Sequence, residues 1–357
     1  MSKIIVGMSG GIDSTTAAAI LKSEGHEIIG MTLKLWDGAS RCCDYDDIMD
    51  AKKACWKLGI KHYVINAKRE FKKQVVNYFI SDYLKGKTPN PCVICNERIK
   101  FRFLIKKMKE IGFDYVATGH YARTEEEDGK YCLKKGADSK KSQEYFLSMV
   151  KSKDLKYIKF PLGEITKEEV KRIARDMGFD VSKKESQEVC FLQDKETPYE
   201  FIFKNMDSQK IEKGAFYSIE EEKLGDIDEA YFKYTIGQRK GLRYAAGRPL
   251  YVVEIDAEKK RVIIGEKEKA YTKSFTIENI NLFCGDYINR KFEAEVKIRY
   301  KSKPCMAKII LSGNRGKIEF HEPQFAVTPG QLCVFYKNDY VLGSGFILKN
   351  ENKLAKT

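Results

Sequence analysis

The sequence predicts an α/β protein with an N-terminal doubly wound parallel sheet, a small central domain and a C-terminal antiparallel β-barrel. Strand-like and helix-like runs alternate in the first part of the chain, which is typical of a parallel sheet with helices on both faces. Runs at 251–255 and 261–264 predict a central hairpin, and short strand-like runs from about residue 276 indicate a closed barrel. We expect domains at 1–203, 204–273 and 274–357.

The alternation can be followed element by element in the first domain. Strands are expected at 3–6, 26–33, 63–65 and 115–118, and helices at 14–22, 46–58, 69–85 and 96–111. Pro89 and Pro91 are expected to keep the chain non-helical until about Asn96. Thr166 and Glu169 form a capping-box pattern, which opens a helix that ends before Gly178.

The length, hydrophobic content, net charge and cysteine count limit the classes of protein to which the chain can belong. The 357 residues are 43% hydrophobic, which supplies enough core for two or three domains. No run is long enough to span a membrane and no signal peptide is apparent, so we expect a cytoplasmic protein. Its net charge of +14 is typical of a partner of a polyanion, although a lysine-rich composition bias would give the same value. The ten cysteines then indicate sulfur chemistry, a metal centre or core packing rather than structural disulfides.

The stretch Ser9–Ser14 lies between the first expected strand and the first expected helix. Its two consecutive glycines let the backbone approach a ligand, and the first N–H groups of the helix point toward an anion. The serine hydroxyls add donors, and the Asp13 carboxylate can hold a magnesium ion between phosphates. The lysine of a Walker A loop is absent. The stretch predicts a phosphate site, and an ordinary glycine turn is the alternative.

Two cysteine segments are candidates for chemistry. Cys92 and Cys95 form a C-x-x-C pair near the start of an expected helix, where the helix dipole and nearby cations favour a reactive thiolate. A packed pair or half of a zinc site are the alternatives, but there is no second C-x-x-C and the chain has only four histidines. Cys190 lies in the apolar run 189–192, so by its neighbours alone it is a core residue.

The pattern S-G-G-x-D-S at 9–14 resembles the PP-loop of the ATP pyrophosphatase superfamily, whose members adenylate a carbonyl oxygen and then displace AMP. Further blocks resemble the bacterial tRNA-specific 2-thiouridylases, in order from residue 3 to about 346. These blocks are 7–14, 88–91, 95–96 with 99–101, 117–121, 142–143 with 145–147, 190–191, 235–242 and 328–331. This resemblance implies the PP-loop fold for the first domain.

The resemblance implies that ATP and Mg²⁺ are used to thiolate the wobble uridine of tRNA. The residues implied to bind ATP are Gly7, Met8, Ser9, Gly10, Gly11, Ile12, Asp13, Ser14, Leu33 and Gly119. Cys190 matches the cysteine that carries a persulfide, and Cys95 matches the nucleophile that closes a transient disulfide with it. The sulfur would come from a cysteine desulfurase, a relay protein or sulfide.

The resemblance also implies which residues meet the tRNA. These are Asn90, Pro91, Cys92, His120, Lys141, Ser142, Gln143, Arg299, Tyr300 and Gln331. Position 92 departs from the pattern, because some relatives have aspartate there. Three thiols, Cys92, Cys95 and Cys190, are also a reasonable ligand set for a four-iron four-sulfur cluster that could carry sulfide. Persulfide transfer and cluster chemistry both remain open at this point.

Two other functional classes compete with this interpretation. An amide-forming ATP pyrophosphatase would share the loop at 7–14 but would not need Cys95 or Cys190. A non-catalytic tRNA-binding or redox-sensing protein would use Cys92 and Cys95 only as a dithiol. Release of pyrophosphate from ATP that depends on tRNA distinguishes the modifying enzyme from both.

Overall fold

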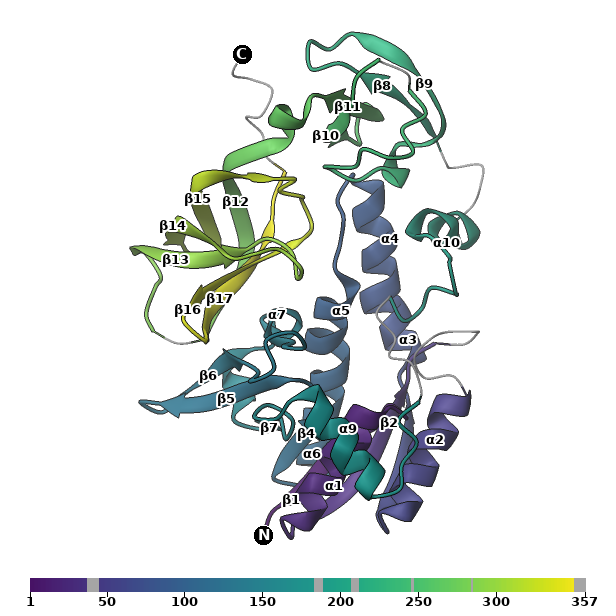
Figure 1. The fold of residues 1–357 in the computed structure, drawn as a ribbon, viewed down its shortest axis with the longest axis vertical. Helices are drawn as coiled ribbons and strands as arrows, with labels where there is room; N and C mark the ends of the chain where they lie inside the picture. Colours follow the sequence, from purple (N-terminus) through teal and green to yellow (C-terminus); the bar gives the residue numbers. More distant parts are fainter. Residues whose placement is uncertain (37–44, 183–188, 207–211, 245–246, 284, 350–357) are drawn as a thin grey trace.

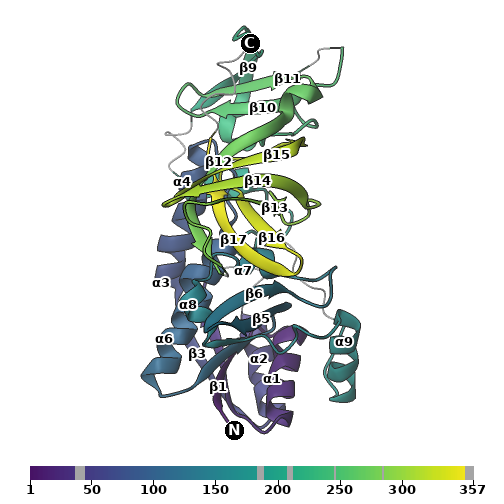
Figure 2. The ribbon, with the colours of Figure 1, turned by 90° about the vertical axis from the view of Figure 1, so that its left-hand side faces the viewer.

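The structure, a computed structural model, describes residues 1–36, 45–182, 189–206, 212–244, 247–283 and 285–349. The N-terminal domain and the central sheet lie at opposite ends of the long axis, and the barrel lies between them (Figures 1 and 2). No helix in the described part of the chain is long and apolar enough to cross a membrane.

The first domain is built on a five-stranded parallel sheet in the order β3-β2-β1-β4-β7. Its strands are β1 Lys3–Gly7, β2 Glu27–Lys34, β3 Lys61–Asn66, β4 Tyr115–Thr118 and β7 Ile158–Lys159. Ile4, Ile5 and Val6 of the central strand are completely buried, as expected of a strand covered on both faces. The strand order reverses between β1 and β4, which is where ligands of such sheets bind. The predicted parallel sheet is confirmed.

Helices flank this sheet and extend beyond it. They are α1 Ile12–Ser23, α2 Tyr45–Lys57, α3 Lys68–Phe71, η1 Lys72–Val76, α4 Asn77–Leu84, α5 Pro91–Ile94, η2 Cys95–Phe101, α6 Arg102–Glu110, α7 Glu144–Leu147, α8 Ser152–Leu155, α9 Lys167–Asp176 and α10 Pro198–Asn205. The expected helix at 69–85 is the run α3-η1-α4, in which η1 is π-helical. The capping box of Thr166 and Glu169 is present at the start of α9, as predicted.

One boundary was predicted wrongly. The helix expected from Asn96 already begins at Pro91 and continues through η2 into α6. A proline in the first helical position loses no hydrogen bond and has a φ angle suited to a helix. The Asn90 side chain caps this helix by accepting a hydrogen bond from the Val93 N–H at 3.4 Å.

The central domain carries a four-stranded sheet in the order β10-β11-β8-β9. Its strands are β8 Lys213–Tyr217, β9 Lys223–Ala230, β10 Tyr251–Asp256 and β11 Arg261–Gly265, with short 3₁₀ turns η4 Tyr231–Lys233 and η5 Lys267–Ala270. β10 and β11 pair antiparallel, so the predicted hairpin is confirmed.

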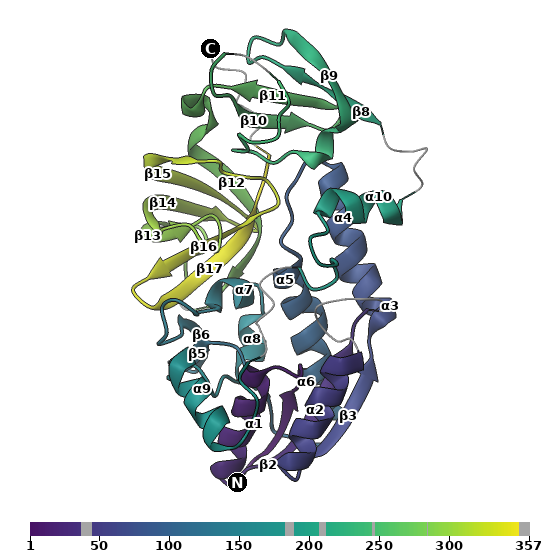
Figure 3. The ribbon, with the colours of Figure 1, turned by 45° about the vertical axis from the view of Figure 1, so that its right-hand side comes forward.

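The C-terminal barrel is closed, because β12 pairs with both β15 and β17. Its strands are β12 Tyr271–Leu282, β13 Lys291–Lys297, β14 Cys305–Ser312, β15 Arg315–Phe325, β16 Leu332–Lys337 and β17 Tyr340–Ile347. A hairpin of the first domain, β5 Ala122–Glu127 and β6 Lys130–Lys135, extends this sheet through β17 (Figure 3). The barrel was predicted, but this hairpin was not.

Buried hydrogen bonds attach the barrel to the first domain. The Tyr145 hydroxyl donates to the Leu332 carbonyl at 2.8 Å, and the Ser344 hydroxyl donates to the Ser148 carbonyl at 2.7 Å. The Asn281 amide donates to the carbonyls of Ser148 and Val150. The two domains therefore share a polar interface that fixes their relative position.

We expect Tyr145→Phe to lower the free energy of unfolding by about 1–2 kcal/mol, because the buried Leu332 carbonyl loses a donor. Tyr340→Phe is the matched control, since the Tyr340 hydroxyl bonds Glu125 at an exposed position. The control should change stability by less than about 0.5 kcal/mol. Urea denaturation of both variants gives the comparison, and equal losses would contradict this account of the interface.

Candidate active site

The loop between β1 and α1 has the internal bonding of a preformed anion site. The Ser14 hydroxyl donates to the Gly11 carbonyl at 3.0 Å and accepts from the Ser9 N–H at 3.2 Å. Gly11 is the N-cap of α1 and provides no side-chain cap, so the first N–H groups of the helix remain directed into the loop. Met8 is buried beneath it, where its carbonyl accepts from the Thr32 hydroxyl at 2.8 Å.

Close backbone contacts explain two of the glycines at this loop. Gly10 has a φ of +76°, and a Cβ there would lie 2.4 Å from the Asp47 carbonyl oxygen. A Cβ on Gly119, which follows β4, would lie 2.6 Å from the Asp13 carbonyl carbon. Gly7 ends β1, Ile12 begins α1 and Leu33 is buried near the end of β2, so all the expected ATP residues lie at this end of the sheet.

The Asp13 carboxylate is held by two side chains. The Tyr121 hydroxyl and the Lys167 ammonium each approach Asp13 Oδ1 to 2.7 Å. The Lys167 side chain is only 3% exposed, whereas that of Asp13 is 29% exposed. Neither partner was identified from the sequence, although Lys167 directly follows the capping residue Thr166.

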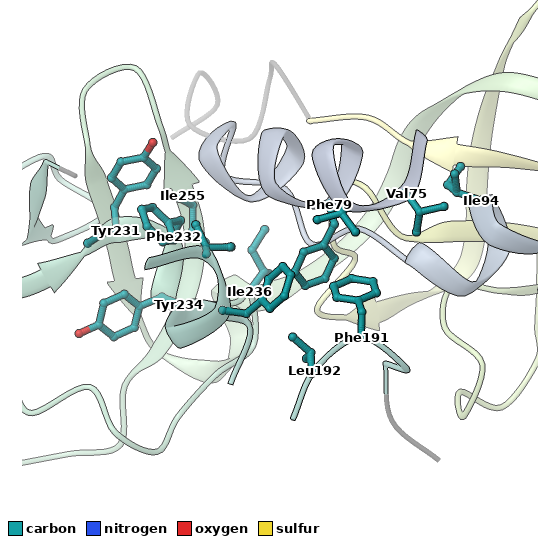
Figure 4. Packing of buried hydrophobic residues seen from close by; sticks show 14 of the residues in the cluster. Val75, Phe79, Ile94, Phe191, Leu192, Tyr231, Phe232, Tyr234, Ile236 and Ile255 are labelled. Atoms are coloured by element: carbon teal, nitrogen blue, oxygen red, sulfur yellow. The ribbon is translucent and has the colours of Figure 1, made fainter. Parts of the chain in front are cut away.

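The two cysteine segments meet in one hydrophobic cluster. Cys95 is 5% exposed and belongs to a buried group with Ile94 and Phe191, and Cys190 packs against the same group. The Phe191 ring lies 5.2 Å from that of Phe79 and 5.0 Å from that of Phe201, measured between centroids. Figure 4 shows Phe191 and Leu192 facing α4. Cys95 therefore lies inside a helix and in the core, whereas the chain was expected to be non-helical until about Asn96.

Cys92 is half-buried in the first turn of α5, directly after Pro91. Within the described ranges, no three histidine, cysteine, aspartate or glutamate side chains are grouped so that they could hold a metal ion. Cys92, Cys95 and Cys190 all belong to those ranges. Cys42 and Cys43 lie outside them.

The barrel holds the segment that leads to Cys92. The Thr88 N–H donates to the Pro329 carbonyl at 2.8 Å, and the Gln331 amide donates to the Thr88 carbonyl at 2.7 Å. Gly330 between them has a φ of +86°, and a Cβ there would lie 2.9 Å from the Lys87 Cβ. Both backbone polar groups of Thr88 are thus engaged by one turn of the barrel.

The other residues expected to meet tRNA are also bonded within the chain. The buried Ser142 hydroxyl bonds Glu144, and Gln143 exchanges two hydrogen bonds with the backbone of Tyr121. The Tyr300 ring lies 4.5 Å from that of Phe146, and Arg299 donates to the Phe325 carbonyl at 3.4 Å. Lys141 immediately precedes Ser142. These residues lie where the first domain meets the barrel.

His120 lies among aromatic rings, with Phe101 at 5.9 Å and Phe160 at 6.4 Å between centroids. Its Nδ1 is 2.8 Å from the Thr118 hydroxyl. Burial, and to a smaller extent the positive charge of Lys100, lowers the pKa of His120 to about 3. The imidazole is therefore neutral at physiological pH.

Comparisons with known proteins place the chain in a family. Family models described as tRNA methyl transferase HUP domain, tRNA methyl transferase PRC-barrel domain and aminomethyltransferase beta-barrel domain match residues 2–194, 200–266 and 272–347. The chain is 42% identical over 359 residues to the tRNA-specific 2-thiouridylase MnmA of Carboxydothermus hydrogenoformans, covering 97% of this chain and 98% of that protein. The chain belongs to the tRNA-specific 2-thiouridylase family.

Other members of the 2-thiouridylase family match as fully. The protein of Acetivibrio thermocellus is 42% identical, with 97% of this chain and 99% of that protein covered. The protein of Clostridioides difficile is 40% identical, with 98% of each covered. A solved complex of a 4-thiouridine synthetase with RNA and ATP aligns with a TM-score of only 0.36 at 17% identity, over 50% of this chain and 41% of that one. The family assignment therefore rests on the sequence relatives.

The lowered pKa of the half-buried His120 in this 2-thiouridylase predicts a pH dependence of stability. Because the folded-state pKa of His120 is below its unfolded value of about 6.5, the unfolded chain takes up the proton first as the pH falls. Stability is therefore lost between pH 6.5 and about 3, by about 2 kcal/mol at pH 5 from this residue alone.

We expect His120→Gln to lose less stability than the wild type between pH 7.5 and pH 5, by about the same 2 kcal/mol. Urea denaturation at both pH values measures the difference. Parallel losses in the two proteins would show that His120 is not held neutral by the fold.

Proposed function

We propose that this chain is a tRNA-uridine 2-sulfurtransferase, which uses ATP to activate the C2 oxygen of the wobble uridine before sulfur displaces AMP. The observation that carries this proposal is the identity of about 40% over nearly the whole length to proteins named tRNA-specific 2-thiouridylases. The meeting of the Cys95 and Cys190 segments in one cluster supports it. The enzyme acts in the cytoplasm.

The loop at 7–14 binds the phosphates of ATP. N–H groups at the start of α1 and the hydroxyls of Ser9 and Ser14 are donors to the phosphate oxygens. The uridine O2 attacks the α-phosphorus, the bond to the bridging oxygen breaks, and pyrophosphate leaves. Asp13 would hold Mg²⁺, which neutralises charge on the phosphates as they separate.

Sulfur is delivered by the two cysteines. The terminal sulfur of a Cys190 persulfide attacks uridine C2, and the C2–O bond to AMP breaks. The Cys95 thiolate then attacks Cys190 Sγ, which closes a Cys95–Cys190 disulfide and leaves the second sulfur on C2 as the thiocarbonyl. The outer sulfur reaches Cys190 by transfer from the persulfide of a cysteine desulfurase or a relay protein, whose thiol is the leaving group, and an external thiol then reduces the Cys95–Cys190 disulfide. Free sulfide could serve only the cluster route described below. Because Cys95 is buried, the base must approach it at the start of α5, beside Asn90 and Cys92.

Incubation with unmodified tRNA and ATP tests the proposal. We expect AMP and pyrophosphate to form only when tRNA is present, and 2-thiouridine to appear in digested tRNA when a persulfide donor is added. ATP cleavage without tRNA, or tRNA binding without ATP cleavage, would overturn it in favour of an amide-forming enzyme or a non-catalytic binder.

A four-iron four-sulfur cluster on Cys92, Cys95 and Cys190 is the second route to sulfur delivery. We derive no step through it, because the described residues hold no group of three such ligands. Persulfide transfer needs only Cys95 and Cys190, so Cys92 then lines the approach to the base.

We expect Cys95→Ala and Cys190→Ala to abolish thiolation while tRNA-dependent AMP formation continues. Cys92→Ala should retain thiolation within about tenfold, since a contact beside the base is worth about 1 kcal/mol. Nucleoside mass analysis measures the product. Complete loss in Cys92→Ala, together with iron in anaerobically purified protein, would instead favour the cluster.

A further inference from the structure

The nucleotide loop has a buried lysine that comes from a distant part of the chain. Lys167 begins α9, and its ammonium lies 2.7 Å from Asp13 Oδ1 with the side chain only 3% exposed. Its backbone N–H donates to Asp138 at 3.1 Å, and Thr166 caps the helix. Apolar packing also joins the two helices, because Ala17 of α1 and Val170 of α9 belong to one buried cluster. α9 is thus anchored by several contacts besides the ion pair.

A buried ion pair stabilises the contact between two helices only weakly, because both charges must be desolvated. Removing an ammonium and a carboxylate from water costs free energy that their attraction only partly returns, and apolar residues of similar size would often pack as well. The position of this pair therefore suggests a role other than joining the helices. It lies in the loop that receives the phosphates, at the only charged residue of 7–14.

The geometry of Asp13 indicates what the pair does. Lys167 and Tyr121 both donate to Oδ1, so they hold the carboxylate in one orientation and leave Oδ2 as the oxygen that can meet a ligand. The Tyr121 hydroxyl is aimed by its own buried ring and by the two backbone bonds to Gln143. The Asp13 side chain is 29% exposed, so its two partners cover the carboxylate only in part.

The negative charge of Asp13 must also be balanced if the loop is to receive phosphates. A carboxylate at the start of α1 repels phosphates unless a cation balances it, and the loop lacks the lysine of a Walker A motif. We propose that Lys167 is a positioning residue of the nucleotide site, which acts through Asp13 to allow binding of the magnesium pyrophosphate part of ATP. The inference rests on the proposed function, since it assumes that this loop binds ATP.

Titration calorimetry of the full-length protein with magnesium pyrophosphate, and separately with AMP, tests this role without tRNA or turnover. Lys167→Met should weaken pyrophosphate binding by about 10- to 100-fold, the effect of losing a charged hydrogen bond. AMP affinity should stay within about twofold, because AMP lacks the β- and γ-phosphates. Arg172→Met is the matched control, since it removes a positive charge from an exposed position of α9, and it should bind both ligands as the wild type does.

The double variant Lys167→Met with Asp13→Asn shows whether the lysine acts through Asp13. If it does, the double variant binds pyrophosphate no more weakly than Asp13→Asn alone. Losses that multiply would overturn the positioning role. Equal losses for pyrophosphate and AMP, with a lower Tm, would reduce Lys167 to a structural link between helices.

If Lys167→Met does not fold, Tyr121→Phe can be measured in its place. It removes one donor from Asp13 Oδ1 without changing charge, so pyrophosphate affinity should fall by about three- to tenfold. Unchanged affinity would overturn the inference. If the wild type and Lys167→Met both bind ATP normally, only this inference is overturned. If the wild type binds neither ATP nor pyrophosphate, the proposed nucleotide site is overturned as well.

Discussion

The candidate site depends on one hydrophobic contact, the packing of Phe191 against Phe79 and its neighbours. The segment that carries Cys190 has little regular structure, so aromatic packing rather than a hydrogen-bond ladder holds it in place. The same cluster includes Cys95 and extends to Ile264 of the central sheet. One core thus fixes both cysteine segments and connects them to the domain at the far end of the molecule.

The barrel contributes to the site in a different way. Its turn at 328–331 binds both backbone polar groups of Thr88, just before the helix that carries the two neighbouring cysteines. Gln331 was expected from the family resemblance to contact tRNA, and within the chain it holds this segment. A tRNA that engages the barrel at Gln331 would therefore also act on the position of α5. With the proposed roles of Gln331 and Cys95, substrate binding and the position of the nucleophile would be physically linked there.

The sequence was sufficient where structure is determined by local pattern. The parallel sheet, the capping box at Thr166 and the central hairpin follow from periodicity and turn residues, and all are present. The start of α5 was missed because proline disrupts the interior of a helix but is favoured in its first position. Asn90, a residue type that often caps helices, directly precedes this proline and could have indicated the helix start. The Lys167–Asp13 pair and the Thr88 contacts join residues that are distant in sequence, and no local pattern reports such contacts. The domain boundaries at 203 and 273 stay predictions.

The hairpin β5–β6 has a consequence for how the chain matures. β6 belongs to the first domain, yet its outer edge pairs with β17, the last strand of the barrel. During synthesis on the ribosome this edge emerges long before its partner, and it must wait with unpaired N–H and C=O groups while the central domain and most of the barrel are made. Such a late closure over a long sequence separation is slow and exposes the nascent chain to mispairing. The pairing of β6 with β17 can therefore form only after Tyr340 and Val341 have left the exit tunnel.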